Sequence, residues 1–587
     1  MKNNLKFSVS AHSRESEDLL TAVLVKRGVS DVNFFENLSR MDVNVPGLNP
    51  HSLFNMDRAI STILDAISAN LSIGILVDGD ADGFSAASML NMYLRKAYRD
   101  DKINILSLGY KSHGLDNSME IIKNSGVDLI LVPDAGSNDF DSQELLTAAG
   151  MQVVIIDHHD IDEQSKAMSS DAIIVNNMMR MNADTNVNFV GAGMVLQFIK
   201  ALDEKLQVGI DNELSLFALG QVADMSDISD YEIRHEVFVG YQQMKKHPLF
   251  SSVFTDFELD NMSAHKMAFE LIPKINAVSR VGTVEERIDL VNVMSAIYDE
   301  DDLISVERRR KNKVSGKMEK VELQWSRYEL AVDILKKIKA RQDAVVKKNL
   351  GTLEYISQPS DGVMIAVMGD ELPSALSGLI ANKIISQYSM PAFVVRKNGD
   401  KYSGSMRCPG EFEFRTWLNE TALASSQGHE QAAGVEFNAD DLEALLEQTR
   451  TLDIAKDFYE VDKIYNEDTV NVNEVQMLND NISLFGGRVS EARLGFSSIP
   501  IAKSSIKVRG SVITFSYKGL TFLMYNGTWF ADWLMTTGFK KEFRFDIYGG
   551  PAENNWNNVI TTQIIIDDIA LSDKVPEKTV VEEDYDF

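Results

Sequence analysis

The residues best suited to chemistry are aspartates and histidines in the first 224 positions, several of which directly follow short apolar runs. They are Asp78, Asp80, Asp82, Asp134, Asp157, His158, His159 and Asp224. A single aspartate after a strand is usually a turn former or a helix cap. Several buried together would repel one another strongly unless cations compensate. Because carboxylate oxygens mixed with imidazole nitrogens suit Mn²⁺ or Mg²⁺ better than Zn²⁺ or Ca²⁺, we expect a site for divalent metal ions.

The apolar runs before these groups predict the strands that position them. They cover residues 73–77, 103–108, 129–132 and 153–156, and helical stretches separate them. Continuous apolar strands separated by helices are typical of a parallel sheet that is buried on both faces. Ligands of such sheets bind beyond the carboxyl ends of the strands. We therefore expect the acids and histidines to converge at one edge of an α/β domain, with Asp224 joining them from a helical region over residues 190–250.

The length of the chain predicts several globular parts. It has 587 residues, of which 44% are hydrophobic, and one hydrophobic core rarely supports so many residues. We expect an N-terminal segment over 1–50 that covers the next domain, an α/β domain over 51–300, a long basic helix over 301–350, a smaller α/β domain over 351–452, an OB-like β-barrel over 453–572 and an acidic tail over 573–587. The predicted fold class is α/β, with two lobes joined by the long helix.

The charge of the chain is acidic overall but basic in one segment. The formal net charge is −29, whereas binding to nucleic acid normally requires a basic surface. Between residues 307 and 348, however, 14 Lys or Arg stand against 6 Asp or Glu. This segment is either a solvated helix face or a nucleic-acid contact. The absence of a long apolar run or a signal-peptide pattern, with Cys408 as the single cysteine, predicts a cytoplasmic protein with no membrane segment.

The order of the acidic motifs resembles that of the DHH phosphoesterase superfamily. The motifs are D-x-D-A-D-G, a strand-end aspartate, D-H-H and G-x-V-A-D. The resemblance implies that the metal ligands are Asp78, Asp80, Asp82, Asp134, His158 and Asp224. It also implies that Asp134 bridges two metal ions, that His159 contacts the scissile phosphate, and that Asp157 orients its neighbours. The implied reaction is phosphodiester hydrolysis with two divalent cations, Mn²⁺ or Mg²⁺.

Further segments resemble the RecJ exonucleases within that superfamily. Residues 427–434, QGHEQAAG, are similar to the GGHxxAAG signature of the DHH-associated domain, with Gln427 in place of the first glycine. Residues 403–407 are similar to a G-S-x-R segment and residues 275–280 to an N-A-x-x-R element, while residues 555–569 resemble the closing strands of the RecJ OB-fold. The implied substrate-binding residues are Asn276, Arg280, Ser405, Arg407, Gly428, His429 and, in a substrate-facing loop, His113.

The RecJ resemblance implies hydrolysis of single-stranded DNA from the 5′ end, in recombination or repair. One alternative is a DHH phosphodiesterase that acts on short oligonucleotides or RNA. Such enzymes need only the two lobes, so the chain beyond residue 455 favours the first reading. Another alternative, a non-catalytic nucleic-acid-binding member, would have lost ligands that are all present here.

The last part of the chain offers further contacts to nucleic acid and to partners. Aromatic residues of the barrel could stack on bases; the candidates are Phe515, Tyr517, Phe522, Tyr525, Trp529 and Trp533. The acidic tail, which ends in Asp586 and Phe587, looks like the tips of single-strand-binding proteins. It would either recruit a single-strand-binding or recombination protein or serve only as a solvated end.

Overall fold

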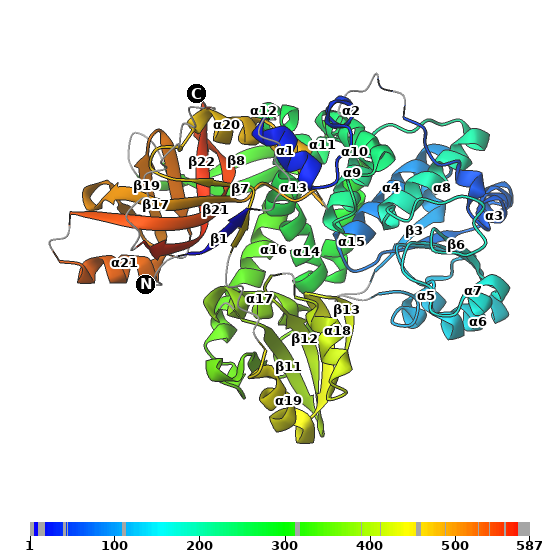
Figure 1. Cartoon of the computed structure of the whole chain (residues 1–587). Helices are drawn as coiled ribbons and strands as arrows, with labels where there is room; N and C mark the ends of the chain where they lie inside the picture. Colours follow the sequence, from blue (N-terminus) through cyan, green and yellow to red (C-terminus); the bar gives the residue numbers. More distant parts are fainter. Residues whose placement is uncertain are drawn as a thin grey trace, which may run out of the picture.

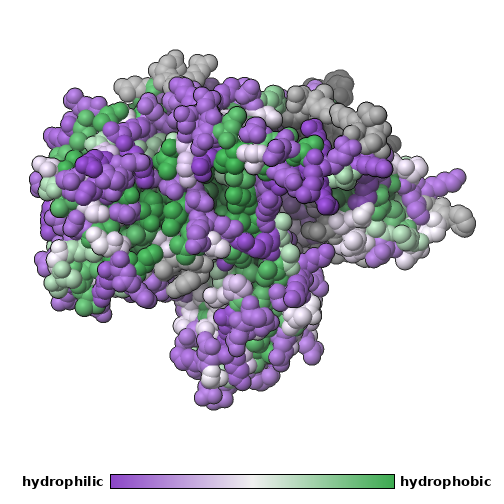
Figure 2. Space-filling model, turned by 180° about the vertical axis from the view of Figure 1, so that it is seen from behind, coloured by the Kyte–Doolittle hydropathy of each residue, from purple (hydrophilic) through white to green (hydrophobic). Residues whose placement is uncertain are grey.

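Three domains lie around one long helix in the computed structural model (Figure 1). The structure describes residues 5–572, apart from 10–17, 39–42, 44, 108–112, 312–316, 389, 411, 453–458, 488, 526, 539–540 and 557–558. The acidic tail over 573–587 lies outside the described residues. From behind, the second α/β domain stands out as a separate lobe below the other two domains (Figure 2). The long helix is α16 (Arg327–Leu350).

The first α/β domain is built on a five-stranded parallel sheet. Its strands are β2 (Ile73–Leu76), β3 (Ile103–Leu106), β4 (Leu129–Pro133), β5 (Gln152–Asp157) and β6 (Ile173–Asn176). Their order in the sheet is β3-β2-β4-β5-β6, and every neighbouring pair is parallel. The chain leaves β2 toward one edge and returns at β4 on its other side, so the topological switch point lies between β2 and β4. The predicted parallel sheet is confirmed, and β6 is an additional strand.

Helices cover both faces of this sheet. The helices of the whole domain are α3 (Met56–Ser68), α4 (Ala81–Ala97), α5 (Met119–Ser125), α6 (Phe140–Ala148), α7 (Gln164–Ser169), α8 (Gly191–Leu206), α9 (Glu213–Ala223), α10 (Tyr231–Gln243), α11 (Pro248–Val253), α12 (Asp256–Asp260), α13 (Ala264–Glu270), α14 (Ile272–Val281) and α15 (Val284–Met294). One core contains Ile75, Leu131 and Ile156 with α4 and α8. A second core contains Leu76, Val132 and Ile155. Neighbouring residues of one strand thus enter different cores, which explains why the strands are apolar throughout.

The prediction of a single helix over residues 301–350 is wrong in its first half. Residues 303–326 form an antiparallel hairpin of β7 (Leu303–Lys311) and β8 (Met318–Ser326), and only then does α16 begin. Along β8, the partly buried Val321, Leu323 and Trp325 alternate with exposed residues, which is the period of a strand rather than that of a helix. Ser326 then starts α16 with a capping box to Glu329.

The second α/β domain contains a six-stranded mixed sheet. The strands are β9 (Glu354–Tyr355), β10 (Met364–Val367), β11 (Ala392–Asn398), β12 (Lys401–Arg407), β13 (Ala424–His429) and β14 (Ala432–Asn438), in the order β13-β14-β12-β11-β10-β9. Only β10 and β11 pair in parallel. The helices are α17 (Ser377–Tyr388), α18 (Phe414–Glu420) and α19 (Leu442–Thr449).

The C-terminal domain is a seven-stranded sheet, consistent with the expected OB-like barrel. Its order is β16-β17-β21-β22-β20-β19-β18. The strands are β16 (Lys463–Tyr465), β17 (Leu494–Ala502), β18 (Lys507–Arg509), β19 (Val512–Tyr517), β20 (Leu520–Met524), β21 (Glu542–Trp556) and β22 (Val559–Leu571), with helices α20 (Val472–Asp480) and α21 (Thr528–Thr536).

The N-terminal segment packs mainly on this C-terminal domain, not on the domain that follows it in sequence. Strand β1 (Phe7–Val9) pairs in parallel with β15 (Tyr459–Val461). Helices α1 (Leu19–Lys26) and α2 (Val32–Asn37) place Leu24 and Phe35 in the C-terminal core. The expectation that residues 1–50 cover the next domain is therefore wrong for these helices, because their apolar faces find their partners more than 400 residues later in the chain.

A buried arginine joins the N-terminal segment, the first α/β domain and the C-terminal domain. Arg234 of α10 is fully buried. Its guanidinium lies 3.5 Å from the ring centroid of Phe35 and donates to the carbonyl oxygens of Phe35 and Leu484 at 3.2 and 3.3 Å.

Within the described residues, no helix has the length and the apolar character needed to cross a membrane.

Candidate metal centre

The structure gathers the predicted acids and histidines at the carboxyl edge of the parallel sheet. Three overlapping groups have ligand atoms within 4.8 Å of one another. They are Asp78 with Asp80 and Asp134; Asp82 with His158 and Asp224; and Asp134 with Asp157, His158 and His159. The site lies at the switch point between β2 and β4, where an open α/β sheet is expected to bind its ligand.

Asp134 and His158 each belong to two of the three groups, and Asp134 is the one carboxylate that does so. Its amide donates to the carbonyl oxygen of Ile156 at 2.8 Å, which fixes the end of β4 against β5. Its φ is +64°, a left-handed conformation that is uncommon for an aspartate. Such strained residues cluster at functional sites, where the surrounding structure holds them in place.

The two histidines differ in environment. Asp157 accepts from Nδ1 of His159 at 2.7 Å and from the backbone amide of Ser137 at 3.1 Å. That hydrogen bond to Asp157 raises the pKa of His159 to about 9. Burial lowers the pKa of His158 to about 4. At neutral pH, therefore, His159 carries a proton on both nitrogens and His158 offers a lone pair.

Nε2 of His158 points at the acids of the other groups. It lies 3.2 Å from Oδ1 of Asp134 and 3.8 Å from Oδ2 of Asp224. Asp224 follows α9 directly and comes from a different part of the domain than the sheet. The neutral ring of His158 thus faces carboxylates from two directions, and the lone pair of its Nε2 is available to a metal ion held with them.

The segment after β2 has both a structural and a chemical role. Oδ1 of Asp80 accepts from the amides of Asp82 and Gly83 at 3.1 Å each and so caps α4. Asp80 is therefore a helix cap, which is a usual role of an aspartate after a strand, and it is also part of the cluster. His113, predicted to face substrate, places Nδ1 2.9 Å from Oδ2 of Asp78.

Glycines allow neighbouring helices to approach the acids. A Cβ on Gly191, the first residue of α8, would collide with the carboxylate of Asp134. A Cβ on Gly220 of α9 would collide with Oδ1 of Asp82. The same oxygen accepts from the amide of Ala192 at 3.0 Å. The helices can therefore lie directly on the carboxylates only because these two positions lack a side chain.

The electrostatics of the cluster call for cations. Burial and then the neighbouring carboxylates raise the pKa of Asp134 and of Asp82 well above the usual value. Burial also raises the pKa of Asp78. Among the described residues, Oδ2 of Asp82 and Oδ1 of Asp134 are buried and accept no hydrogen bond. Buried carboxylate oxygens without donors, next to a neutral imidazole, fit divalent ions that accept oxygen and nitrogen ligands.

The predicted substrate-binding residues of the second α/β domain lie next to one another. In the register of the sheet, Arg407 pairs with Ala432, and Ala432 pairs with His429. Ser405 is two residues from Arg407 on the same face of β12, and its Oγ lies 2.7 Å from Oγ of Ser377. Gly428 precedes the exposed His429 at the end of β13. These residues form one basic and polar edge of the sheet.

This edge faces the first α/β domain through a pair of arginines. Burial, and then the charge of Arg407, lowers the pKa of Arg280 on α14, whereas Asp80 opposes the shift. Arg280 is thus electrostatically coupled both to the second domain and to the metal centre. Asn276 lies one helical turn before Arg280 on the same helix and is half-buried.

Some residues of the site were not predicted. Asn176 ends β6 and donates to Oγ of Ser137 at 2.9 Å and to the carbonyl oxygen of His159 at 3.0 Å. Asn176 therefore fixes the backbone at the end of the D-H-H segment. The signal was present in the sequence, because Asn176 is one more polar residue that directly follows an apolar run, over residues 173–175.

The aromatic candidates of the C-terminal domain separate into two sets. Phe515 and Phe522 are buried in the core and Tyr517 and Trp533 are partly buried against it, whereas Tyr525 and Trp529 are 58% and 44% exposed. The exposed pair lines a groove of about 1100 Å³ that also includes Lys383 of α17. The groove therefore runs between the C-terminal domain and the second α/β domain.

Comparison with known proteins gives two domain matches. Residues 72–221 match the DHH family, N-terminal domain, and residues 360–452 match the DHHA1 domain. The Bacillus subtilis prophage protein YorK, described as a candidate single-strand DNA-specific exonuclease, is 28% identical over 514 residues, which are 84% of this chain and 85% of YorK. The single-stranded-DNA-specific exonuclease RecJ of the same organism is 24% identical, over 94% of this chain and 68% of RecJ.

A solved structure shows the same fold over nearly the whole chain. RecJ of Thermus thermophilus in complex with Mn²⁺ superposes with a TM-score of 0.68, at 17% identity, covering 98% of this chain and 80% of that one. The predicted combination of two α/β lobes with a C-terminal β-rich domain is therefore confirmed as a fold.

Proposed function

We propose that this chain, a RecJ-like protein with DHH and DHHA1 domains, is a single-strand-DNA-specific exonuclease that uses two divalent cations, Mn²⁺ or Mg²⁺. The observation that carries the proposal is that Asp134 is the one carboxylate in two of the three ligand groups of the described residues, as expected of a carboxylate that would hold two ions. When bound, such ions would polarise the phosphate, lower the pKa of a shared water and stabilise the leaving oxygen. The 5′-to-3′ direction is part of the proposal and is supported by the resemblance to RecJ.

The side chains of the first α/β domain would hold the ions and the reacting phosphate. Asp78, Asp80 and Asp82 would supply carboxylates from the segment after β2, and His158 and Asp224 would complete the set. His159, protonated at neutral pH through its bond to Asp157, would donate a hydrogen bond to a phosphate oxygen. Because Asp157 fixes the ring of His159, this donor needs no reorganisation during the reaction.

The residues facing the metal centre from the second lobe would bind the terminal nucleotide. Arg280 and Arg407 carry positive charge on the two sides of the junction, and a guanidinium matches phosphate oxygens in shape and charge. Ser405 and His429 on the same sheet edge would add hydroxyl and imidazole donors. Asn276 and Gly428 would lie beside the backbone of the strand, and His113 beside Asp78.

The C-terminal domain supports a long single-stranded substrate over a short one. The groove between this domain and the second lobe exposes Tyr525 and Trp529, and stacking of a base on such a ring contributes about 1 to 3 kcal/mol. An enzyme for dinucleotides would not need these rings. We therefore propose a strand that leaves the metal centre and continues along this groove.

The cellular role that we propose is DNA recombination or repair, in the cytoplasm. Its support is the likeness to RecJ proteins. We also propose that the acidic segment near Phe587 recruits a single-strand-binding or recombination protein. Removal of the residues after Pro576 should then abolish binding to such a partner while hydrolysis of DNA is kept, and unchanged binding would contradict the proposal.

The test is digestion of a 5′-labelled single strand with Mn²⁺ or Mg²⁺. We expect release of labelled mononucleotide, no release in the presence of a chelator, and strong inhibition by a bulky 5′ block. Asp134→Asn should be inactive, whereas the control Asp101→Asn, at an exposed ion pair with Arg99, should be fully active. Hydrolysis of a dinucleotide or of RNA, but not of the long DNA strand, would support the alternative phosphodiesterase and contradict the proposal.

A further inference from the structure

Arg287 is a buried cation beside the candidate metal centre. It lies on α15, and only 1% of its surface is exposed. Arginine is almost never fully buried unless it is paired. Burial lowers the pKa of Arg287 to about 10, and the charge of Asp78 opposes this shift. The guanidinium therefore remains protonated at neutral pH, within electrostatic reach of the acids.

Two hydrogen bonds connect Arg287 to the segment that carries the first three acids. Nη2 of Arg287 donates to the carbonyl oxygen of Ser279 on α14. Oγ of Ser279 in turn donates to the carbonyl oxygen of Gly79. Gly79 is the residue between Asp78 and Asp80, so these bonds join α15, α14 and the metal-binding segment in one chain.

The same helix α14 carries two of the predicted substrate contacts. Ser279 directly precedes Arg280 and follows Asn276 by less than one helical turn. A displacement of α14 would therefore move Arg280 and, through Ser279, the backbone of Gly79. The geometry of the metal-binding segment and that of the predicted phosphate contact Arg280 therefore both depend on the position of α14.

We infer that Arg287 is a positioning residue that fixes α14 onto the segment Asp78–Gly83 and thereby holds both Asp78 and Asp80 in metal-binding geometry. Its charge also offsets part of the repulsion among the carboxylates before any cation binds. The effect on metal affinity does not depend on the substrate; the effect on DNA hydrolysis rests on the proposed function.

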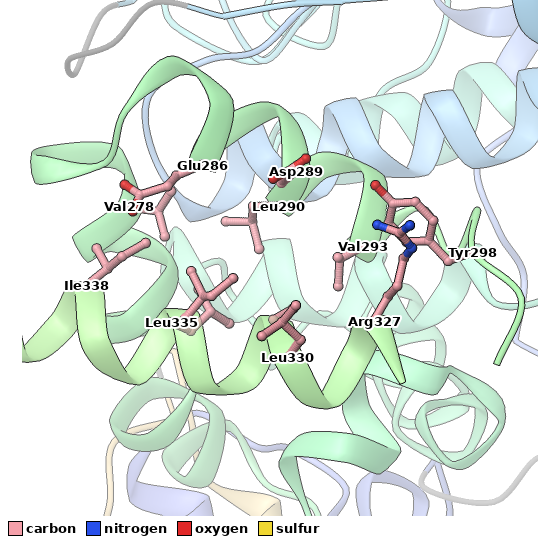
Figure 3. A pocket seen from close by; sticks show the side chains of 12 residues that line it. Val278, Glu286, Asp289, Leu290, Val293, Tyr298, Arg327, Leu330, Leu335 and Ile338 are labelled. Atoms are coloured by element: carbon pink, nitrogen blue, oxygen red, sulfur yellow. The ribbon is translucent and has the colours of Figure 1, made fainter. Parts of the chain in front are cut away.

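The packing around α14 allows this role to be separated from folding. Val278, next to Ser279 on α14, lines a small and mostly apolar pocket of about 100 Å³ together with Leu290 of α15 and Leu335 of α16 (Figure 3). These apolar contacts hold α14 in the domain without Arg287. Loss of the polar connection should therefore make the segment around Gly79 less well fixed, while the domain stays folded.

A second arginine provides a matched control. Arg341 of α16 donates to the carbonyl oxygen of Val281, at the end of the same helix α14, at 2.8 Å. It also pairs with Glu286 at 2.6 Å. Its side chain is 44% exposed, and no bond to the acidic segment is found for it in the described part of the chain.

The experiment is a calorimetric titration of the metal-free full-length protein with Mn²⁺. We expect Arg287→Met and Ser279→Ala each to weaken binding about 10- to 100-fold, the usual effect of losing a residue that orients metal ligands. The double variant should be no weaker than Arg287→Met, because both changes break the same connection. Arg287→Lys should recover part of the affinity, and Arg341→Met should bind as the wild type does.

Circular dichroism and thermal denaturation identify variants that fail to fold. If Arg287→Met is folded and binds Mn²⁺ with wild-type affinity, the inference is wrong. If Arg287→Met does not fold, Ser279→Ala decides, and wild-type affinity in that variant would overturn the inference. Since the titration needs no DNA, a wild-type protein that binds Mn²⁺ but does not cleave DNA would contradict the proposed function alone.

Discussion

Replacement of Asp134 by asparagine should have opposite effects on the metal-free and the metal-loaded protein. Asparagine keeps the size of the side chain and tolerates the left-handed φ of +64° at this position, so the backbone should not change. What is lost is one negative charge in the middle of the cluster. The variant therefore isolates the charge of the bridging carboxylate.

The magnitude follows from the spacing of the ligand atoms. Two like charges no more than 4.8 Å apart repel by at least about 3 kcal/mol at an effective dielectric constant of about 20. Because burial and this repulsion already raise the pKa of Asp134, part of the repulsion is relieved by protonation, and we expect the metal-free variant to be stabilised by about 1 to 2 kcal/mol. With Mn²⁺, both ions lose a ligand, and an affinity loss of about 100-fold for each corresponds to about 2.8 kcal/mol.

The assay is thermal denaturation with and without Mn²⁺, together with a titration that counts bound ions. Asp134→Asn should melt above the wild type without metal and gain almost nothing from Mn²⁺. Asp224→Asn, in only one of the ligand groups, should weaken one ion and leave the other. Binding of both ions to Asp134→Asn at wild-type affinity, or a lower melting temperature of the metal-free variant, would refute the reasoning.

Three further predictions concern pH, packing and the junction between domains. The raised pKa values of Asp82 and Asp134 mean that the folded metal-free protein binds more protons than the unfolded chain, so its stability should fall as pH rises above about 4. The rise in melting temperature on adding Mn²⁺ should therefore grow between pH 5 and 8, and a constant rise would contradict this. Gly191→Ala should abolish Mn²⁺ binding, because its Cβ meets the carboxylate of Asp134; Gly351→Ala, with open space at its Cβ, is the control and should bind normally. Arg234→Leu leaves two buried carbonyl oxygens without their donor and should lower the free energy of unfolding by about 2 to 5 kcal/mol, measured by urea denaturation; a loss below 1 kcal/mol would show that the junction does not depend on it.

The convergence of the acids and histidines at the candidate metal centre could be predicted because strand order and strand ends are local signals. The apolar runs fix where β2, β4 and β5 end, and a parallel sheet brings these ends to one edge, so Asp78, Asp134 and His158 had to lie close together. Asp224 lies on a helix end, a common place for an acid, and only the motif order singled it out.

The structure differs from the prediction where the sequence signal is not local or is compatible with two kinds of element. The segment that forms β7 and β8 has few glycines and no proline, which predicts a helix, although Val321, Leu323 and Trp325 alternate with the period of a strand. The docking of Phe35 could not be predicted, since nothing in the first 50 residues specifies a partner so distant in sequence. Arg287 belongs to no sequence motif, so its hydrogen bond to Ser279 could not be predicted.

The pairing of β1 with β15 has a consequence for the order of assembly during synthesis. The first α/β domain has all its strands by residue 176, and its core is complete once α16 has supplied Tyr328, Leu335 and Ile338, so it can fold before the C-terminal domain is made. The C-terminal core cannot form in this way, because helices α1 and α2 emerge from the ribosome first and must wait for the last strands. An isolated fragment starting at residue 459 should therefore expose the apolar surface that Leu24 and Phe35 cover and aggregate, whereas the same fragment supplied with residues 5–38 as a separate peptide should remain in solution.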